Sequence, residues 1–386
     1  MNAVDLEFRN VTRRYGTVVA VDDLSLLVPA GKICVLVGPS GCGKTTSLKM
    51  VNRLIEPSEG QILIGGRDVM AQDPIELRRG IGYVIQQVGL LPHLSVGRNV
   101  AVVPGLLGWE GKRIDARVDE LLGLVGLKPG SYRNRYPAEL SGGERQRVGV
   151  ARALAADPPL MLMDEPFGAV DPIVRERLQN ELLRLQEQLA KTILFVTHDI
   201  DEAVKMGDLV AVLQVGGVLA QFASPAEILA HPASDFVARF VGADRGLKRL
   251  SLSRVADLEL LPAMTARDGD PAAPLKQRLS ATAFPYLLLV DEDGRPVGWL
   301  DQDDLPGDGA VAASAAVSMS PLLSRRTTLK DALSQLLDAD VMAGIVVDEQ
   351  ERVLGLVTVE QMAGALRDQR PAAAFSDVKE VTVDDA

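Results

Sequence analysis

Residues 38–46, with the sequence GPSGCGKTT, constrain what this chain can fold into more than any other feature. The segment has a glycine, four residues, a second glycine, then lysine and threonine. An apolar run (33–37) enters it and a helical run (44–53) leaves it. Its glycines let backbone N–H groups turn inward, and the following helix adds the positive end of its dipole. The pattern therefore predicts a phosphate-binding loop between a buried strand and a helix.

This loop also carries the side chains that a nucleoside triphosphate site needs. Lys44 can reach the β- and γ-phosphates, and the Thr45 hydroxyl can ligate Mg²⁺. A glycine-rich turn without a ligand is the alternative, and the flanking strand and helix argue against it. We expect ATP to be bound by Gly38, Pro39, Ser40, Gly41, Cys42, Gly43, Lys44, Thr45 and Thr46.

Two acidic residues end another apolar run, LMLMDEP at 160–166. Ligands of parallel sheets bind at the carboxyl ends of the strands. Asp164 would hold the Mg²⁺ through water, and Glu165 would act as general base toward the attacking water. His198 ends the run TILFVTH (192–198). A lone histidine is more often structural, but an adjoining strand end would bring this one to the γ-phosphate.

Short runs rich in Val, Ile and Leu alternate with helical stretches as far as about residue 240. Apolar runs between helices predict a parallel sheet covered on both faces. The segment 87–157 differs, because it is mostly helices and loops, and we expect a helical subdomain inserted between strands. The apolar runs are 32–38, 62–66, 160–166 and 192–198.

Charge is unevenly distributed along the chain, whose formal net charge is −11. Residues 1–245 carry 27 basic and 29 acidic side chains, whereas residues 246–386 carry 14 and 23. The split suggests two modules, of which the second is acidic. Neither part resembles a basic nucleic-acid-binding surface, so we expect no nucleic-acid partner.

The two cysteines, the start of the chain and the lengths of its apolar runs bear on the cellular compartment. Cys34 and Cys42 lie in an apolar run and in the glycine-rich loop, a usage that fits a reducing cytoplasm rather than a disulfide. The start, MNAVDLEFRN, lacks the apolar core of a signal peptide, and no run approaches the ~18 apolar residues of a membrane span. If such a chain works at a membrane, another chain must hold it there.

Residues 140–146, LSGGERQ, distinguish between classes of nucleotide hydrolase. As an isolated string they could be a capped helix start. Together with the loop at 38–46 and the acidic pair at 164–165, in this order and spacing, they make the chain resemble the ABC ATPases over about residues 3–240. The resemblance implies ATP hydrolysis and an α/β fold of the P-loop NTPase class, with a parallel-sheet core, a β-subdomain and a helical subdomain.

The resemblance further implies a head-to-tail homodimer, in which each ATP lies between one subunit's loop and the other subunit's signature. Ser141, Gly142 and Gly143 would face the partner's phosphates, because within one chain they would lie too far from the loop. Tyr15 resembles the aromatic residue that stacks on adenine. Asp171, in GAVD, resembles the aspartate that crosses the dimer interface.

A glutamine in the run GYVIQQ completes the expected site. Gln86 resembles the family's glutamine that senses Mg²⁺ and contacts the membrane subunit, although the adjacent Gln87 could be confused with it. Gln86 is preferred because the family's glutamine follows two apolar residues, as Val84 and Ile85 do here. The expected catalytic residues are Glu165, His198, Lys44 and Gln86, and the expected metal ligands are Thr45, Gln86 and Asp164.

An internal repeat follows the nucleotide-binding part. LLLVDEDGRPVGWLDQDDL (287–305) aligns without gaps on GIVVDEQERVLGLVTVEQM (344–362), an offset of 57 residues, and Leu279 matches Leu336 in the helical pattern before each copy. The repeat resembles a tandem pair of CBS motifs, which implies a C-terminal α/β module. The expected organisation is an ATPase domain at 1–242, a linker at 243–255, CBS motifs at 256–306 and 316–368, and an acidic tail at 369–386.

The segments 51–69 and 81–96, together with the CBS pair, resemble the ATP-binding subunits of quaternary-amine uptake systems. These systems import glycine betaine, choline, carnitine or proline betaine. The resemblance implies membrane permease subunits, a periplasmic or lipid-anchored substrate-binding protein, and a peripheral position on the cytoplasmic face of the inner (plasma) membrane. An importer ATPase for another solute and a soluble, non-transport ABC protein remain alternatives. A single cassette without a long coiled insertion disfavours the second.

Each copy of the repeat keeps only half of the Gly-x-x-Thr-x-x-Asp pattern of nucleotide-binding CBS motifs. The first copy has Gly298, Asp301 and Asp304, and the second has Gly355, Thr358 and Gln361. Simple AMP or ATP binding is therefore not expected. Our hypothesis is that the acidic module gates transport by sensing a cyclic dinucleotide or ionic strength, which would screen its charges. A module that only packs or dimerises is the alternative.

Overall fold

The computed structural model describes residues 3–85, 89–168, 171–282, 284–307, 309–317, 321–339 and 341–368. The chain divides into two compact units, Met1–Ala243 and Asp244–Ala386. None of the helices in the described ranges combines the length and the apolar character needed to cross a bilayer.

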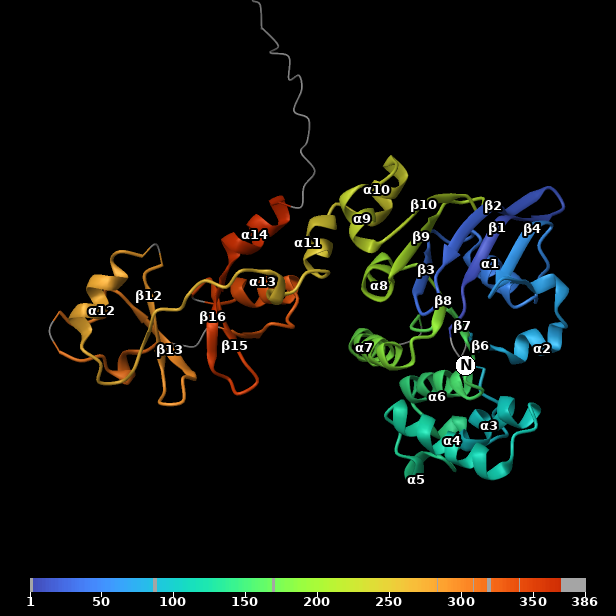
Figure 1. Ribbon diagram of the computed structural model, residues 1–386, viewed down its shortest axis with the longest axis horizontal. Coiled ribbons are helices and arrows are strands. Elements are labelled where there is room, and N and C mark those ends of the chain that lie inside the picture. The colour runs from blue at the N-terminus through green and yellow to red at the C-terminus, as the bar shows by residue number, and fades with distance from the viewer. Residues whose placement is uncertain are drawn as a thin grey trace, which may run out of the picture. The chain divides into compact units, whose positions relative to one another are not determined.

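A six-stranded sheet forms the centre of the first unit, with the strand order β10-β9-β3-β8-β7-β6 (Figure 1). The neighbours from β9 to β6 are parallel, and β10 joins one edge antiparallel to β9. The predicted parallel sheet is therefore confirmed for the runs around residues 33, 160 and 192. The strands are β3 (Ile33–Val37), β6 (Ile81–Val84), β7 (Leu160–Asp164), β8 (Thr192–Thr197), β9 (Leu209–Leu213) and β10 (Leu219–Ala223).

The apolar run 62–66 does not belong to that sheet, so its sequence-based assignment was wrong. Its first residues end β4, in a separate antiparallel sheet of order β2-β1-β4-β5. Gly65 and Gly66 have φ of 56° and 75° and form the tight turn of a hairpin into β5. A Gly-Gly pair between strands favours such a turn. These strands are β1 (Leu6–Tyr15), β2 (Val18–Val28), β4 (Glu59–Ile64) and β5 (Arg67–Asp68).

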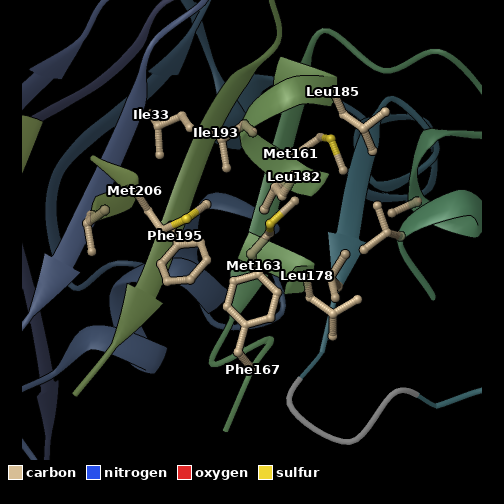
Figure 2. Packing of buried hydrophobic residues seen from close by; sticks show 14 of the residues in the cluster. Ile33, Met161, Met163, Phe167, Leu178, Leu182, Leu185, Ile193, Phe195 and Met206 are labelled. Atoms are coloured by element: carbon tan, nitrogen blue, oxygen red, sulfur yellow. The ribbon is translucent and has the colours of Figure 1, made fainter. Parts of the chain in front are cut away.

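Successive side chains of the central strands point to opposite faces of the sheet, and each face packs into its own hydrophobic core. Odd-numbered residues of β3, β7 and β8, such as Met163 and Phe195, face the helices of one layer. Even-numbered residues, such as Leu162 and Leu194, face α1 and the antiparallel sheet. Figure 2 shows the first of these faces, where Leu178, Leu182 and Leu185 of α7 cover the strands. Burial on both faces explains why these strands are apolar throughout.

A helical subdomain lies between β6 and β7 in sequence. It contains α3 (Val96–Leu106), α4 (Gly111–Leu124), α5 (Pro129–Tyr132) and α6 (Gly142–Leu154). Figure 1 shows these helices grouped together and away from α1 (Lys44–Val51). Helix α1 packs on β7, β8 and β2. The other helices of this unit are α2 (Pro74–Arg79), α7 (Pro172–Leu189), α8 (Ile200–Met206), α9 (Pro225–Ala230) and α10 (Asp235–Val241).

The second unit repeats one small α/β motif at the predicted 57-residue offset. Each copy has a three-stranded sheet, with one parallel and one antiparallel pair. The first copy has β11 (Thr265–Ala266), α12 (Ala272–Leu279), β12 (Tyr286–Val290) and β13 (Pro296–Asp301). The second has β14 (Leu322–Ser324), α13 (Leu329–Leu337), β15 (Ala343–Val347), β16 (Val353–Thr358) and α14 (Val359–Asp368).

The segment 243–255, expected as a linker, holds a helix of its own. It is α11 (Arg245–Leu250), which packs on α13 and α14 of the second unit. Leu250 is fully buried in the core of the second repeat copy. Because this run is short and rich in basic residues, its sequence pattern alone did not predict burial.

Each repeat copy pairs with the short segment that leads into the other copy. Leu261, which precedes the first copy, pairs with Leu356 of the second, and Val317, which precedes the second copy, pairs with Trp299 of the first. Glycine is required at the crossing in each copy. A Cβ atom on Gly355 would lie 2.8 Å from the Leu261 carbonyl oxygen. The glycines that the two copies share therefore have a packing role that needs no bound nucleotide.

This crossing predicts a local effect on stability. Gly355→Ala should lower the free energy of unfolding of the second unit by ~1–3 kcal/mol, because the added methyl group overpacks the segment at Leu261 that pairs with β16. Urea denaturation followed by the fluorescence of the buried Trp299, in a Trp109→Phe background, reports on this unit alone. Gly364→Ala on α14 is the matched control, since nothing lies within 4 Å of its added Cβ. An equal midpoint for Gly355→Ala and its parent would contradict the account.

Candidate functional site

The loop at 38–46 joins the end of β3 to the start of α1 and owes its shape to glycine. Gly43, directly before α1, has φ of 91°, and a Cβ atom there would lie 2.3 Å from the Ala20 carbonyl oxygen. A Cβ atom on Gly38 would approach the Leu213 carbonyl oxygen equally closely. Any larger residue at either position would collide with backbone, so the loop can keep this course only with glycine.

Lys44 lies inside this loop, with 6% of its surface exposed. Its Nζ donates hydrogen bonds to the carbonyl oxygens of Gly38 (2.7 Å) and Pro39 (3.0 Å). The loop backbone therefore curls around a buried ammonium group. A cation held in this way is placed to attract phosphate oxygens that enter the loop.

Thr45 and Asp164 link the loop to the end of β7. The Thr45 hydroxyl donates a 3.0 Å hydrogen bond to Oδ1 of Asp164, which is only 7% exposed. Burial raises the pKa of the Asp164 carboxyl, and the neighbouring Glu165 charge adds to this effect. A hydroxyl and a buried carboxylate side by side are hard oxygen donors, the kind that Mg²⁺ prefers. The donor set fits that ion, whose charge would offset the burial of the carboxylate.

Glu165 follows in a strained turn. Its φ is 43°, in the left-handed region that non-glycine residues rarely adopt, and strain of this kind concentrates at functional sites. Its backbone N–H donates to the Val196 carbonyl oxygen at 2.9 Å. Its Oε1 lies 3.2 Å from Nδ1 of His198, whose side chain is largely exposed. The strand pairing that opposes Asp164 to Val196 brings these two side chains together.

The signature segment begins α6 as a capping box. The Glu144 N–H donates to Ser141 Oγ (3.3 Å), and the Ser141 N–H donates to Oε2 of Glu144 (2.7 Å). The Tyr132 hydroxyl also donates to Glu144 (2.6 Å), and these hydrogen bonds lower the pKa of Glu144 to about 2. Ser141 and Gly142 are exposed at the tip of the helix, so its positive end faces outward.

The remaining expected residues lie on other elements. Asp171 caps α7, where its Oδ1 accepts a hydrogen bond from the Val174 N–H at 3.0 Å. Tyr15 ends β1, is 45% exposed and lies under the Arg13 guanidinium, 4.4 Å from ring centroid to Cζ. Gln86 lies outside the described residues.

The structure thus gathers Lys44, Thr45, Asp164, Glu165 and His198 at one edge of the sheet. The other expected residues lie on different elements: Ser141, Gly142 and Gly143 at the start of α6, Asp171 at the start of α7 and Tyr15 at the end of β1. Sequence reasoning missed the part that Tyr132 and Glu144 play in holding the signature. The Ser-x-x-Glu spacing could have revealed the role of Glu144. Tyr132 contacts Glu144 only because the tertiary structure brings the two residues together.

Comparisons with known families agree with this geometry. Residues 21–168 match the family described as ABC transporter, and residues 319–368 match the CBS domain. Among solved structures, a dimeric structure of MJ0796, a bacterial ABC transporter cassette, is 34% identical, with a TM-score of 0.52. The match covers 57% of this chain and 98% of the MJ0796 chain. A related structure of the same cassette, bound to ADP and Pi, is 33% identical, with a TM-score of 0.51.

Curated relatives extend the similarity over nearly the whole chain. The osmoprotectant import ATP-binding protein OsmV of Salmonella typhimurium is 44% identical over 92% of this chain and 94% of its own length. The glycine betaine/carnitine/choline transport ATP-binding protein OpuCA of Bacillus subtilis is 42% identical over the same shares. This chain therefore belongs to the family of ABC transporter ATP-binding proteins, which hydrolyse ATP to drive transport.

Proposed function

We propose that this protein is the ATP-hydrolysing subunit of an importer for quaternary-amine osmoprotectants. The observation that carries the proposal is the convergence of Lys44, Thr45, Asp164, Glu165 and His198 at one sheet edge, in a chain that matches its relatives over nine-tenths of its length.

At this edge each residue has a separate task. Thr45 and Asp164 would hold Mg²⁺, which supplies positive charge to the phosphates, and Gln86 is proposed as a further ligand. Lys44 would exchange its carbonyl partners for phosphate oxygens. Glu165 would accept the proton of the attacking water, and His198, 3.2 Å away, would orient that carboxylate and contact the γ-phosphate.

The site is proposed to be completed by a second copy of the chain. Ser141, Gly142 and Gly143 of one subunit would meet the phosphates in the other, with Asp171 crossing between them and Tyr15 stacking on adenine. The exposed, dipole-positive start of α6 supports this role, since it attracts anions. The dimeric form described for the related MJ0796 cassette supports it as well.

The partners and location follow from the class of transporter. We propose integral membrane permease subunits as direct partners and a periplasmic or lipid-anchored binding protein as an indirect one. The protein would then sit on the cytoplasmic face of the inner (plasma) membrane. The named cargoes of its relatives, osmoprotectants and glycine betaine, carnitine or choline, support a quaternary-amine cargo here.

The second unit is proposed to regulate transport. Its negative charge supports sensing of ionic strength, and a cleft of about 570 Å³ between its two copies, lined by Arg267 among others, supports a small-molecule ligand such as a cyclic dinucleotide. Gln361 stands where nucleotide-binding motifs have aspartate. Its side chain accepts from the Thr358 N–H at 3.1 Å and donates to the Glu259 carbonyl oxygen at 2.8 Å, so it already has structural partners.

Glu165→Gln tests the proposed general base. The variant should bind ATP as tightly as the parent but hydrolyse it at least ~100-fold more slowly, because an amide cannot accept the proton. Turnover and nucleotide affinity measured on the same preparation check this. Hydrolysis at the parent rate would remove Glu165 from the role.

Uptake of radiolabelled betaine, choline and carnitine tests the cargo. A strain lacking the gene should lose uptake of at least one of them and regain it with the intact chain. The Lys44→Ala variant should not restore uptake, because it lacks the phosphate-binding ammonium. Unchanged uptake of all three compounds in the deletion strain would contradict a quaternary-amine cargo.

The salt dependence of transport tests the regulatory role. ATPase and uptake rates should change with ionic strength in the intact chain and should change less after residues 250–386 are removed. Identical salt curves with and without these residues would exclude the ionic-strength sensor.

A further inference from the structure

A buried carboxylate is bonded to the segment that carries His198. Glu202 lies in the first turn of α8 and is only 6% exposed. The hydroxyl of Thr197, the last residue of β8, donates a 2.7 Å hydrogen bond to Oε2 of Glu202. The same hydroxyl accepts a hydrogen bond from the Asp199 N–H at 3.1 Å. The chain is therefore held on both sides of His198 by one hydroxyl group, and Glu202 anchors that group.

The same carboxylate also contacts α7, which packs with α8 on one face of the central sheet (Figure 1). Oε1 of Glu202 accepts a hydrogen bond from Nε2 of the buried Gln179 at 3.2 Å. Arg175 adds longer ion pairs, to Oε1 of Glu202 (3.8 Å) and to Oδ2 of Asp199 (3.9 Å). The Arg175 N–H donates to the Asp171 carbonyl oxygen at 2.8 Å. Glu202 thus joins the end of β8 to the helix that Asp171 caps.

A carboxylate is a costly choice for this buried position. Burial raises the pKa of the Glu202 carboxyl, and the Asp199 charge adds to this effect, whereas the hydrogen bond from Thr197 and the Arg175 charge lower it. An apolar side chain of similar size would avoid the cost of desolvation. Packing alone therefore does not call for a carboxylate here. What a carboxylate adds is a set of directional hydrogen bonds, to Thr197 on one side and Gln179 on the other.

His198 depends on such support because little packing fixes its side chain, which is 61% exposed. The direction of an exposed side chain is set mainly by the backbone to which it is attached. Its Nδ1 lies 3.2 Å from Oε1 of Glu165. A displacement of about 1 Å would break this contact, and an error of that size in an active site can lower the rate by ~100-fold.

We propose that Glu202 is a positioning residue for ATP hydrolysis. Through Thr197 it holds His198 at hydrogen-bonding distance from Glu165, and through Gln179 it fixes that position relative to α7. Glu202 itself does not touch the nucleotide. This inference rests on the role given to His198 in the proposed function.

Substitution of Glu202 in the full-length chain is the first test. Glu202→Leu should lower kcat for ATP hydrolysis by about tenfold or more and change KM for ATP by less than about twofold, because Lys44 and Thr45 keep their positions. Glu202→Gln keeps an acceptor oxygen and should restore most of the rate. A parent-like kcat for Glu202→Leu would overturn the proposal.

Thr197 offers a second test with almost no change of shape, should Glu202→Leu not fold. Thr197→Val removes the hydroxyl and should lower kcat, whereas Thr197→Ser keeps the hydroxyl and should retain most of the parent rate. Glu187→Leu is the control, because it changes an exposed glutamate of α7, and it should keep the parent kcat. Equal rates for Thr197→Val and Thr197→Ser would contradict the proposal.

Double variants with His198→Ala separate positioning from a general loss of structure. If Glu202 acts through His198, then Glu202→Leu/His198→Ala and Thr197→Val/His198→Ala should be no slower than His198→Ala alone. Losses that multiply would overturn the proposal, since Glu202 would then act elsewhere.

The single variant His198→Ala distinguishes this inference from the function on which it rests. A parent-like kcat for His198→Ala would remove the proposed role of His198 itself. A large loss for His198→Ala with a parent-like kcat for Glu202→Leu and Thr197→Val would leave that role intact and exclude only the positioning by Glu202.

Discussion

The parallel register of β3, β8 and β7 is the constraint on which the rest of the nucleotide site depends. It ends three strands at one edge, so that the loop after β3, the acidic pair after β7 and the histidine after β8 meet there. The 3.0 Å hydrogen bond between Thr45 and Asp164 and the 3.2 Å contact between Glu165 and His198 both follow from this register. A shift of one residue between β7 and β8 would break the contact between Glu165 and His198, and a shift between β3 and β8 would break the hydrogen bond between Thr45 and Asp164.

The site is locally unfavourable, and the surrounding fold makes it possible. A buried ammonium group, a buried carboxylate and a glutamate with positive φ lie within one edge. Relaxation of the loop or the turn would relieve the energetic cost of each of these groups. The groups are instead fixed by strands whose two faces are packed into separate cores. In the proposed function these groups are held ready for a triphosphate and its cation, which would satisfy the charges that the fold has buried.

Local patterns predicted this edge because its chemistry lies in contiguous segments. The glycine spacing at 38–46, the acidic pair and the capped signature each follow from a few neighbouring residues, and the 57-residue repeat follows from self-similarity. The assignment of 62–66 failed because a short apolar run does not reveal which sheet it joins. The bridges that Leu261 and Val317 form between the two repeat copies, and the hydrogen bond from Tyr132 to Glu144, depend on tertiary contacts that no local pattern encodes. The role of Gln86 stays a prediction.

Mixed dimers distinguish a site that the loop of one subunit forms with the signature of another from a site that lies within one subunit. A Lys44→Ala subunit and a Ser141→Arg subunit should each hydrolyse almost no ATP alone, because both sites of each homodimer lack one half. Mixed at equal amounts, they should regain a substantial part of the parent turnover, since one site of the heterodimer pairs an intact loop with an intact signature. Turnover in the mixture that only equals the sum of the two inactive preparations would contradict the account.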